Sequence, residues 1–258
     1  MGSLLDPELQ FALHARPSHG RAMLHKWRDL SFLHFPIEPS VIQGMLPAGL
    51  TVDTFDGMAW VGLVPFWMTG IRFPFAPPLP GFHTFPETNV RTYVHQDGIM
   101  PGVWFFSLDA ANRLAVWGAR KFFGLPYFLS EMEVRRERES IHYLAKRKSD
   151  GAGHDIRVEL GSPLPESKPG TLEFFLIERY LLYANRPGGL FTGIVHHHPY
   201  ELRSIQLVDE EENLLAANGL PERPFVHMCY SPGVDVEVFG IRAARDILPG
   251  NDVSNPTD

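Results

Sequence analysis

The sequence is poor in cysteine, in basic charge and in long apolar runs, and each shortage excludes a class of protein. Cys229 is the single cysteine among 258 residues, so an internal disulfide is excluded. Lys and Arg total 23 against 30 Asp and Glu, a net charge of -7 that offers no basic field to a nucleic-acid backbone. Apolar stretches such as 103–106 and 114–117 fall far short of the roughly 20 residues that span a membrane. Asp6 and Glu8 lie where a secretory signal needs an apolar run, so we expect a cytoplasmic, soluble protein without nucleic-acid or membrane partners.

Glycine and proline, in contrast, are abundant at 23 residues each, which predicts many short elements joined by turns. A hydrophobic content of 44% over this length is enough for one large core. We expect a single domain over 25–247, an N-terminal extension over 1–24 and a flexible tail over 248–258. The fold class predicted is α+β and mostly antiparallel β. Strands are expected near 30–35, 52–55, 59–68, 89–95, 103–108, 127–136, 141–148, 156–160, 190–198, 201–208, 225–231 and 234–239.

Turn and capping signals suggest how these strands connect. Asp56-Gly57 predicts a hairpin between 52–55 and 59–68, and Asp97-Gly98 predicts one between 89–95 and 103–108. The clearest predicted helix runs from Ala110 to Phe123, with Asp109 as its N-cap and Gly124 as its stop. Shorter helices are expected at 41–46, at 171–180 and at 209–217.

The strand at 89–95 carries a row of polar and aromatic side chains on one face. Asn89, Arg91 and Tyr93 are two residues apart and therefore point the same way. Inside a closed barrel this row would form a pocket wall, where the planar guanidinium of Arg91 suits a ligand carboxylate. On an ordinary hairpin the same row would face solvent, and the sequence does not decide between the two.

The segment from Ala119 to Phe128 reads ARKFFGLPYF, a helix end, a glycine stop and a proline that starts a strand. This resembles the acetoacetate decarboxylase superfamily, in which an Arg and a Gly-x-Pro precede a pair of lysines, the first of which forms a Schiff base with a keto acid. The chain looks still more like the DUF2071 (YqjF-like) family, a branch of that fold. Its recurring blocks occur in order over about 27–208 as LPAGLTVDTFDGMAWVGLVPF, ETNVRTYV, GVWFFSLDA, ARKFFGLPY, FLIERYLLY and HHHPYEL.

The resemblance implies a curved antiparallel sheet or barrel that encloses a pocket, with a few helices packed outside. It does not imply Schiff-base chemistry, because Tyr127 and Phe128 occupy the positions of the two lysines. Of the five lysines, Lys121 alone lies inside a family block, one helical turn before the glycine, where a solvated surface charge is expected.

Glu87 corresponds to the glutamate that the superfamily places about forty residues before its lysine. Aromatic neighbours would desolvate this carboxyl group, raise its pKa and suit it to proton transfer. Alternatively, Glu87 pairs with Arg91 or Arg120 and holds a loop at the barrel rim. Arg120 is an anion anchor if the family motif applies, and otherwise a cation that complements a helix C-terminus. Tyr127 would donate a hydrogen bond in place of the lysine.

The run His196-His197-His198 raises the question of a metal. On a strand, His196 and His198 share a face while His197 points away, so at most two of them reach one ion. A catalytic zinc needs about three protein ligands, and we predict no metal and no cofactor.

We therefore expect a protein that binds a small organic carboxylate or carbonyl compound in a barrel pocket. It would be a lysine-independent enzyme of the lyase or hydrolase type, with Glu87 and Tyr127 as catalytic residues and Arg91, Arg120, Tyr93 and Asn89 as ligand-binding residues. The alternative is a non-catalytic binding protein for an apolar or aromatic molecule, suggested by 19 phenylalanines. The sequence leaves the presence of catalysis and a homo-oligomeric state open.

Overall fold

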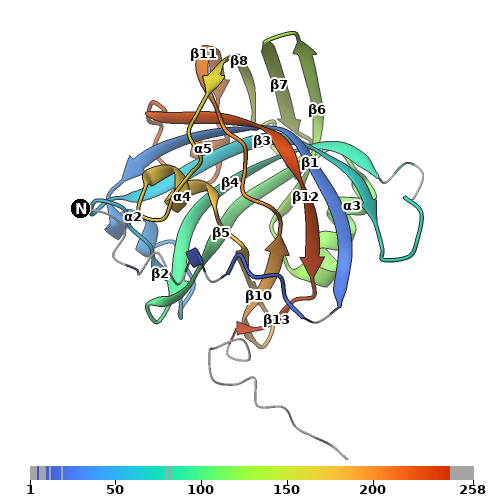
Figure 1. The fold of residues 1–258 in the computed structure, drawn as a ribbon, viewed down its shortest axis with the longest axis vertical. Helices are drawn as coiled ribbons and strands as arrows, with labels where there is room; N and C mark the ends of the chain where they lie inside the picture. The colour runs from blue at the N-terminus through green and yellow to red at the C-terminus, as the bar shows by residue number, and fades with distance from the viewer. Residues whose placement is uncertain are drawn as a thin grey trace, which may run out of the picture.

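A long curved β-sheet forms most of the molecule, and a few short helices pack on its outside (Figure 1). The computed structural model describes Leu5 and residues 10–11, 13–18, 20–78, 81 and 83–244. The tail expected over 248–258 lies outside these residues. The strands are β1 (Arg21–Ile37), β2 (Thr51–Val52), β3 (Ala59–Arg72), β4 (Thr84–Gln96), β5 (Ile99–Ala110), β6 (Tyr127–Glu137), β7 (Ser140–Arg147), β8 (Gly153–Pro163), β9 (Leu181–Arg186), β10 (Gly189–His196), β11 (Arg203–Glu212), β12 (His227–Phe239) and β13 (Arg242–Ala243).

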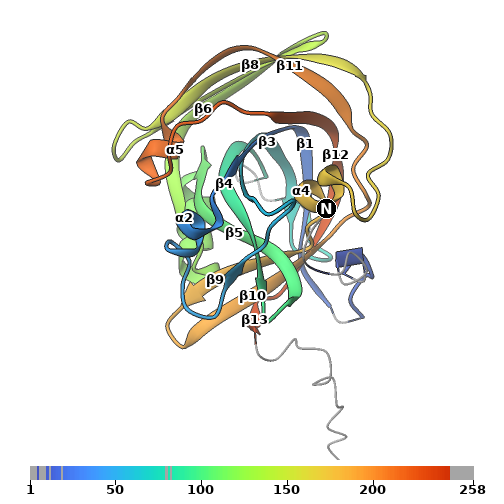
Figure 2. The same ribbon diagram turned by 90° about the vertical axis from the view of Figure 1, so that its left-hand side faces the viewer.

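Strand pairing closes this sheet into two barrels that share one wall. The first barrel follows β12–β1–β3–β4–β5–β9–β10 and returns to β12 through the pairs Val195↔Val238 and His196↔Glu237. The second barrel leaves β5 through β6, β7, β8 and β11 and also returns to β12. Figures 1 and 2 show the shared strands in the middle, with β6, β8 and β11 on one side and β10 on the other. The predicted fold class, a curved and mostly antiparallel sheet, is confirmed.

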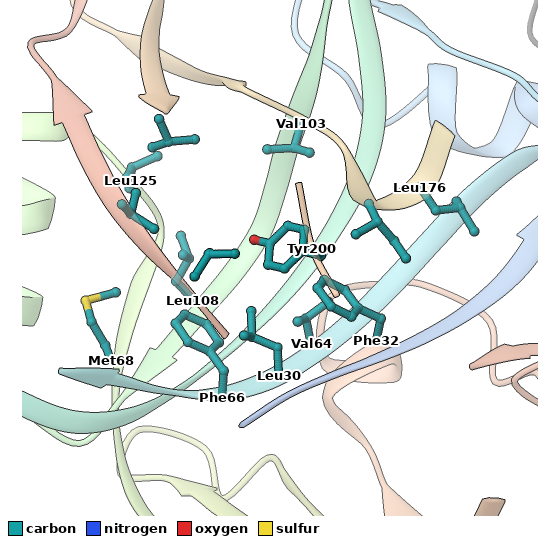
Figure 3. Close-up of a cluster of buried hydrophobic side chains, with 14 of the residues drawn as sticks. Leu30, Phe32, Val64, Phe66, Met68, Val103, Leu108, Leu125, Leu176 and Tyr200 are labelled. Carbon is teal, nitrogen blue, oxygen red and sulfur yellow. The ribbon is translucent and has the colours of Figure 1, made fainter. Parts of the chain in front are cut away.

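Each barrel has its own apolar core because the shared strands present alternate residues to opposite faces. In the first barrel, Phe32, Val64, Phe66 and Leu108 pack around Tyr200, as Figure 3 shows. In the second, Leu33, Leu63, Val90 and other side chains of the same strands face the opposite way. Strands such as β3 are apolar on both faces and hence nearly without polar residues.

The helices are short and are α2 (Pro39–Gln43), α3 (Arg113–Gly118), η1 (Ala119–Phe123), α4 (Leu172–Ile177) and α5 (Leu214–Ala217). The predicted helix from Ala110 was wrong at its start, because β5 continues to Ala110 and Asp109 lies in the strand. The actual N-cap is Asn112, whose side chain accepts hydrogen bonds from the amides of Leu114 and Ala115. The end was predicted correctly, since the helix closes in a π-helical turn at Gly124 with φ 68°.

Three further predictions need correction. The 52–55 segment does not form a hairpin with β3; its residues Thr51 and Val52 pair with β4 instead, and an isolated bridge joins Phe55 to Met58 around the Asp56-Gly57 turn. The acidic segment 209–212 extends β11 rather than starting a helix, so α5 begins only at Leu214. The two strands expected at 225–231 and 234–239 are one continuous strand, β12.

The hairpin of β4 and β5 forms as predicted, and the strands expected at 127–136, 141–148 and 156–160 are β6, β7 and β8, which pair in order as an antiparallel meander. β1 begins at Arg21, inside the segment expected as an N-terminal extension. The Gln10 side-chain amide, from the same segment, donates hydrogen bonds to the carbonyls of Phe174 and Glu178 at 2.8 and 2.7 Å. Within the described residues, no helix is long and apolar enough to cross a membrane.

Candidate functional site

The row predicted on β4 points into the first barrel. Glu87 lies opposite Phe66 and Ala110, and Asn89 lies opposite Val64 and Leu108. These four partners belong to the apolar core of the first barrel, and directly paired residues point to the same side of a sheet.

Arg91 and Tyr93 continue the row on the same side. The Arg91 guanidinium lies 5.7 Å from the centre of the Tyr93 ring and 5.6 Å from that of Phe32. The row is therefore an interior wall and not a solvent-exposed face.

Glu87 lies at one end of this row of side chains. It is 2% exposed, and the Tyr127 hydroxyl donates a hydrogen bond to its Oε2 at 3.0 Å. Burial raises the pKa of Glu87 to about 8, against the hydrogen bond from Tyr127, and nearby Asp109 raises it further. Burial also raises the pKa of Tyr127 well above its ordinary value. At neutral pH the pair is thus a protonated carboxyl group and a phenol, and neither of the predicted partners Arg91 and Arg120 forms an ion pair with Glu87 among the described residues.

Arg91 is a half-buried cation without a carboxylate partner in the part of the chain that the structure describes. Its Nη2 donates to the carbonyl of Leu176 at 3.1 Å, while its buried Nε has no hydrogen-bond acceptor there. Other interior arginines are paired: Arg179 contacts Asp53 at 2.8 Å and Arg147 contacts Asp109 at 2.7 Å. Arg91 therefore has room in its coordination for an anion.

Other polar atoms on this wall are also unsatisfied. Asn89 Oδ1, between Glu87 and Arg91, has no partner among the described residues, and neither does Trp27 Nε1 on β1. Trp27 pairs with Met68 and packs its ring against Phe66, so it faces the same interior. Buried polar groups are normally hydrogen-bonded, so the unpaired atoms of Trp27, Asn89 and Arg91 distinguish this part of the wall.

Arg120 lies apart from this interior row. Its Nε donates to the backbone carbonyl of Tyr127 at 2.6 Å. Its side chain lines an open surface hollow of about 400 Å³, whose walls are Arg113, Val116, Trp117, Arg120, Lys121 and Leu129. The hollow's floor contacts the first-barrel core through Val116 and Leu129. Arg120 thus holds the backbone of Tyr127 from outside.

The five lysines are all exposed, which places no amine near Glu87. Lys121 stacks over Trp117 at 5.0 Å on the surface, as expected for a solvated charge. Tyr127, at the position where the family resemblance places the Schiff-base lysine, fills this space with a hydroxyl group.

Histidines of the first barrel that sequence reasoning did not assign lie at the other end of the wall. His34 Nε2 is 2.8 Å from the Tyr93 hydroxyl, and His34 Nδ1 is 3.2 Å from His227 Nδ1. These residues come from β1 and β12, 193 positions apart. A glycine at position 62, between the strands of His34 and Tyr93, was the available sequence signal, because a Cβ there would lie 2.8 Å from the His34 ring.

The histidine run at 196–198 does not form a ligand cluster. The rings of His196 and His198 are 6.5 Å apart, and His197 is buried and stacks on Tyr180 at 4.5 Å. Burial lowers the pKa of His197 to about 3. Among the described residues, no three metal-ligating side chains come together.

Solved structures with this architecture are acetoacetate decarboxylase-like enzymes. An acetoacetate decarboxylase from Legionella pneumophila superposes with a TM-score of 0.58 at 14% identity, over 88% of this chain and 92% of that chain. The enduracididine biosynthesis enzyme MppR, complexed with pyruvate, gives 0.61 at 13% identity over 87% and 91%. An acetoacetate decarboxylase-like enzyme from Sphingomonas wittichii RW1 gives 0.59 at 11% over 86% and 92%. The fold is therefore that of acetoacetate decarboxylase-like enzymes.

The sequence comparison is more specific. The family model of DUF2071, described as an uncharacterised conserved protein, matches residues 25–235, and the chain belongs to this family. The uncharacterised protein YqjF of Bacillus subtilis is 38% identical over 225 residues, which cover 85% of this chain and 91% of the relative.

Proposed function

We propose that the first barrel binds a small organic carboxylate or carbonyl compound and that Glu87 and Tyr127 transfer a proton to or from it. The observation that carries the proposal is the combination on one strand of a buried carboxyl group with a raised pKa and a cation that has no counter-ion among the described residues. Glu87 and Arg91 are four residues apart, about 13 Å along the strand before their side chains reach inward. A carboxylate held at Arg91 reaches Glu87 only if the ligand extends past Asn89 along this wall.

Each residue of the row has a role in this proposal. The Arg91 Nε, unpartnered among the described residues, donates to the carboxylate of the ligand, and the Asn89 amide accepts or donates at its middle. Tyr127 donates to Glu87 and can donate instead to a ligand carbonyl oxygen. Glu87, with a pKa raised to about 8, is an acid at neutral pH and becomes a base once its proton has been given up.

The chemistry would be lysine-independent. The exposed lysines offer no interior amine for an imine, so polarisation of a carbonyl group falls to the Tyr127 hydroxyl and the Glu87 carboxyl group. Proton transfer next to a carbonyl is common to lyases and hydrolases, the two reaction types that we favour. MppR, which shares the fold, is described in complex with pyruvate, a compound of this class.

A second candidate function is non-catalytic binding of an aromatic molecule. It is favoured by the rings around Arg91, because Phe32, Tyr93 and Tyr200 form an aromatic enclosure on the same wall. Such an enclosure suits the flat face of an aromatic acid.

The test is a thermal-shift screen of the purified protein with small keto acids, hydroxy acids and aromatic carboxylates. A ligand at about 100 times its dissociation constant stabilises the fold by about 2.7 kcal/mol, a shift of roughly 5–10 °C. We expect a keto or hydroxy acid to give this shift and Arg91→Met to abolish it. Arg135→Met, a change at an exposed arginine that pairs with Glu133, is the matched control and should leave the shift intact.

Glu87→Gln and Tyr127→Phe then separate catalysis from binding. An enzyme loses turnover of the bound compound in both variants and keeps most of its affinity. If a ligand is bound equally well by wild type and Arg91→Met, the interior site is wrong. If aromatic acids bind and their turnover is the same in wild type and in both variants, the binding function replaces the enzymatic one.

A further inference from the structure

The far end of the polar wall is connected to the surface by a chain of titratable side chains. The Tyr93 hydroxyl contacts His34 Nε2 at 2.8 Å, His34 Nδ1 contacts His227 Nδ1 at 3.2 Å, and His227 Nε2 lies 3.7 Å from Glu173 Oε1. Tyr93 and His34 are fully buried, His227 is 13% exposed, and Glu173 is 41% exposed. The chain thus runs from the barrel interior to solvent.

Local structure holds this chain in place. His34, Gly62 and Arg91 are neighbours on β1, β3 and β4, and the absence of a side chain at Gly62 lets the His34 ring pass over β3 to Tyr93. Glu173 sits in the first turn of α4, which Thr171 caps. Phe32 stacks on His34 at 6.3 Å and keeps the ring from rotating.

We propose that Tyr93, His34, His227 and Glu173 form a proton relay between the ligand site beside Arg91 and solvent. The proposal rests on the proposed function and adds to it a second proton-transfer group, Tyr93, at the Arg91 end of the ligand site, since a proton exchanged there inside a closed barrel must be returned to water. The relay residues act through one another and position a proton; only Tyr93 lies next to the ligand site.

The hydrogen bonds among Tyr93, His34 and His227 permit two patterns, and Glu173 lies 3.7 Å beyond the outer ring nitrogen. In the outward pattern Tyr93 donates to His34 Nε2, His34 Nδ1–H donates to His227 Nδ1, and His227 Nε2–H faces the Glu173 carboxylate. In the inward pattern the two rings adopt the opposite tautomers, so that His227 donates to His34 and His34 donates to Tyr93. Each pattern places a single proton between the two Nδ1 atoms.

A transfer through the relay is balanced. As a ligand proton moves to Tyr93 Oη, the Tyr93 proton moves to His34 Nε2, the His34 Nδ1 proton to His227 Nδ1, and the His227 Nε2 proton to Glu173, which releases it to water. One proton enters and one leaves, and neither imidazole becomes charged. This matters because burial lowers the pKa of both rings, and the neighbouring Arg91 cation lowers that of His34 further. After this transfer the two rings are in the inward pattern, so the next transfer runs in the reverse direction and delivers a proton to the site.

The first test is NMR of ¹⁵N-histidine-labelled protein at pH 7 without ligand, which reports the tautomer of each ring. We expect His34 and His227 to be neutral and of opposite tautomers, with one proton shared between their Nδ1 atoms. Two rings of the same tautomer, or an imidazolium at either position, would overturn the relay.

The second test measures exchange of the ring proton of His34 with solvent. Glu173→Gln removes the outer acid–base group, and we expect exchange to slow by about a hundredfold. Glu133→Gln, at an exposed glutamate distant in sequence from the relay, is the control and should leave the rate unchanged. An unchanged rate in Glu173→Gln means that exchange occurs by local opening of the fold, and the relay is then wrong.

A third variant, Tyr93→Phe, tests the inner end. It removes the partner of His34 Nε2 while the histidine pair and Glu173 remain, so exchange through the outer part should persist. Loss of exchange in this variant would contradict the order of the chain. Because all three measurements use the ligand-free protein, they fail or succeed independently of the ligand screen.

Discussion

The two faces of β4 both bury polar side chains, but these side chains differ in how fully they are hydrogen-bonded. On the second-barrel face, Thr88 Oγ1 lies 2.8 Å from His154 Nε2, and the neighbouring Asp109 accepts hydrogen bonds from Ser130 and Arg147. On the first-barrel face, Asn89 and Arg91 keep atoms without partners among the described residues. A buried polar group that is fully paired stabilises the fold, whereas one that is unpaired costs stability and is retained for another purpose. The comparison supports the proposal that the first-barrel face binds a ligand, while the hydrogen-bonded groups of the second-barrel face stabilise the fold.

The largest effect is expected from breaking the paired face. Arg147 and Asp109 are each 1% exposed and joined by two hydrogen bonds, at 2.7 and 2.9 Å. Arg147→Met leaves the Asp109 carboxylate buried without its cation and should lower the free energy of unfolding by about 3–5 kcal/mol. Urea denaturation measures this change. Arg135→Met, at an ion pair with both partners more than half exposed, should change it by at most about 1 kcal/mol. Similar losses in both variants would show that the buried pair has no special role.

Asp109 also marks where sequence reasoning reached its limit. An aspartate before an apolar helical pattern is a common N-cap. Here, however, β5 pairs with β4 and β6 and continues two residues beyond its predicted end at 108, and the Asp109 carboxylate accepts a hydrogen bond from Arg147. Arg147 is 38 residues away from Asp109, and no local sequence pattern predicts their pairing. By contrast, the alternation on β4 depends only on neighbouring residues, so the row from Asn89 to Tyr93 was predictable. Its direction, into a closed barrel, required the pairing of β10 with β12.

The same distinction separates the parts of the site. Glu87 and Tyr127 are 40 positions apart, and the family resemblance, not their spacing, identified both as candidate site residues. The His34–His227 contact joins residues 193 positions apart and had no such help. Arg120 was predicted to be an anion anchor through a family motif, and the structure places its side chain on a surface hollow, where its Nε donates to the Tyr127 backbone carbonyl.

An effect of comparable size, but spread over several pH units, is expected at Glu87. Burial raises its pKa in the folded state to about 8, while the unfolded value is 4.5, so the folded state keeps a proton that the unfolded state loses between these pH values. The free energy of unfolding should therefore fall as pH rises through this window, by about 1.4 kcal/mol per pH unit from this group. Glu87→Gln keeps the hydrogen bond from Tyr127 and lacks the titration, so its stability should decline less steeply with pH.

Denaturation of wild type and Glu87→Gln between pH 5 and 8 measures the difference in slope. Glu137→Gln, at an exposed glutamate, should follow the wild-type curve. Parallel curves for wild type and Glu87→Gln would mean that Glu87 is ionised at neutral pH, and the acid role proposed for it would be lost.

The smallest effect on stability is expected from Arg91→Met, which makes the same chemical change as Arg147→Met on the opposite face. Arg91 has no carboxylate partner among the described residues, so its removal strands no buried charge and costs the hydrogen bond to the Leu176 carbonyl, about 1 kcal/mol, and the cation–π contacts with Phe32 and Tyr93. Packing of the methionine against Phe32 and Tyr93 offsets part of that cost. Urea denaturation of the two methionine variants side by side measures the difference between their free energies of unfolding. A loss at Arg91 as large as that at Arg147 would reveal that Arg91 is a structural cation like the others, whereas a near-neutral change combined with loss of ligand binding separates function from stability at a single side chain.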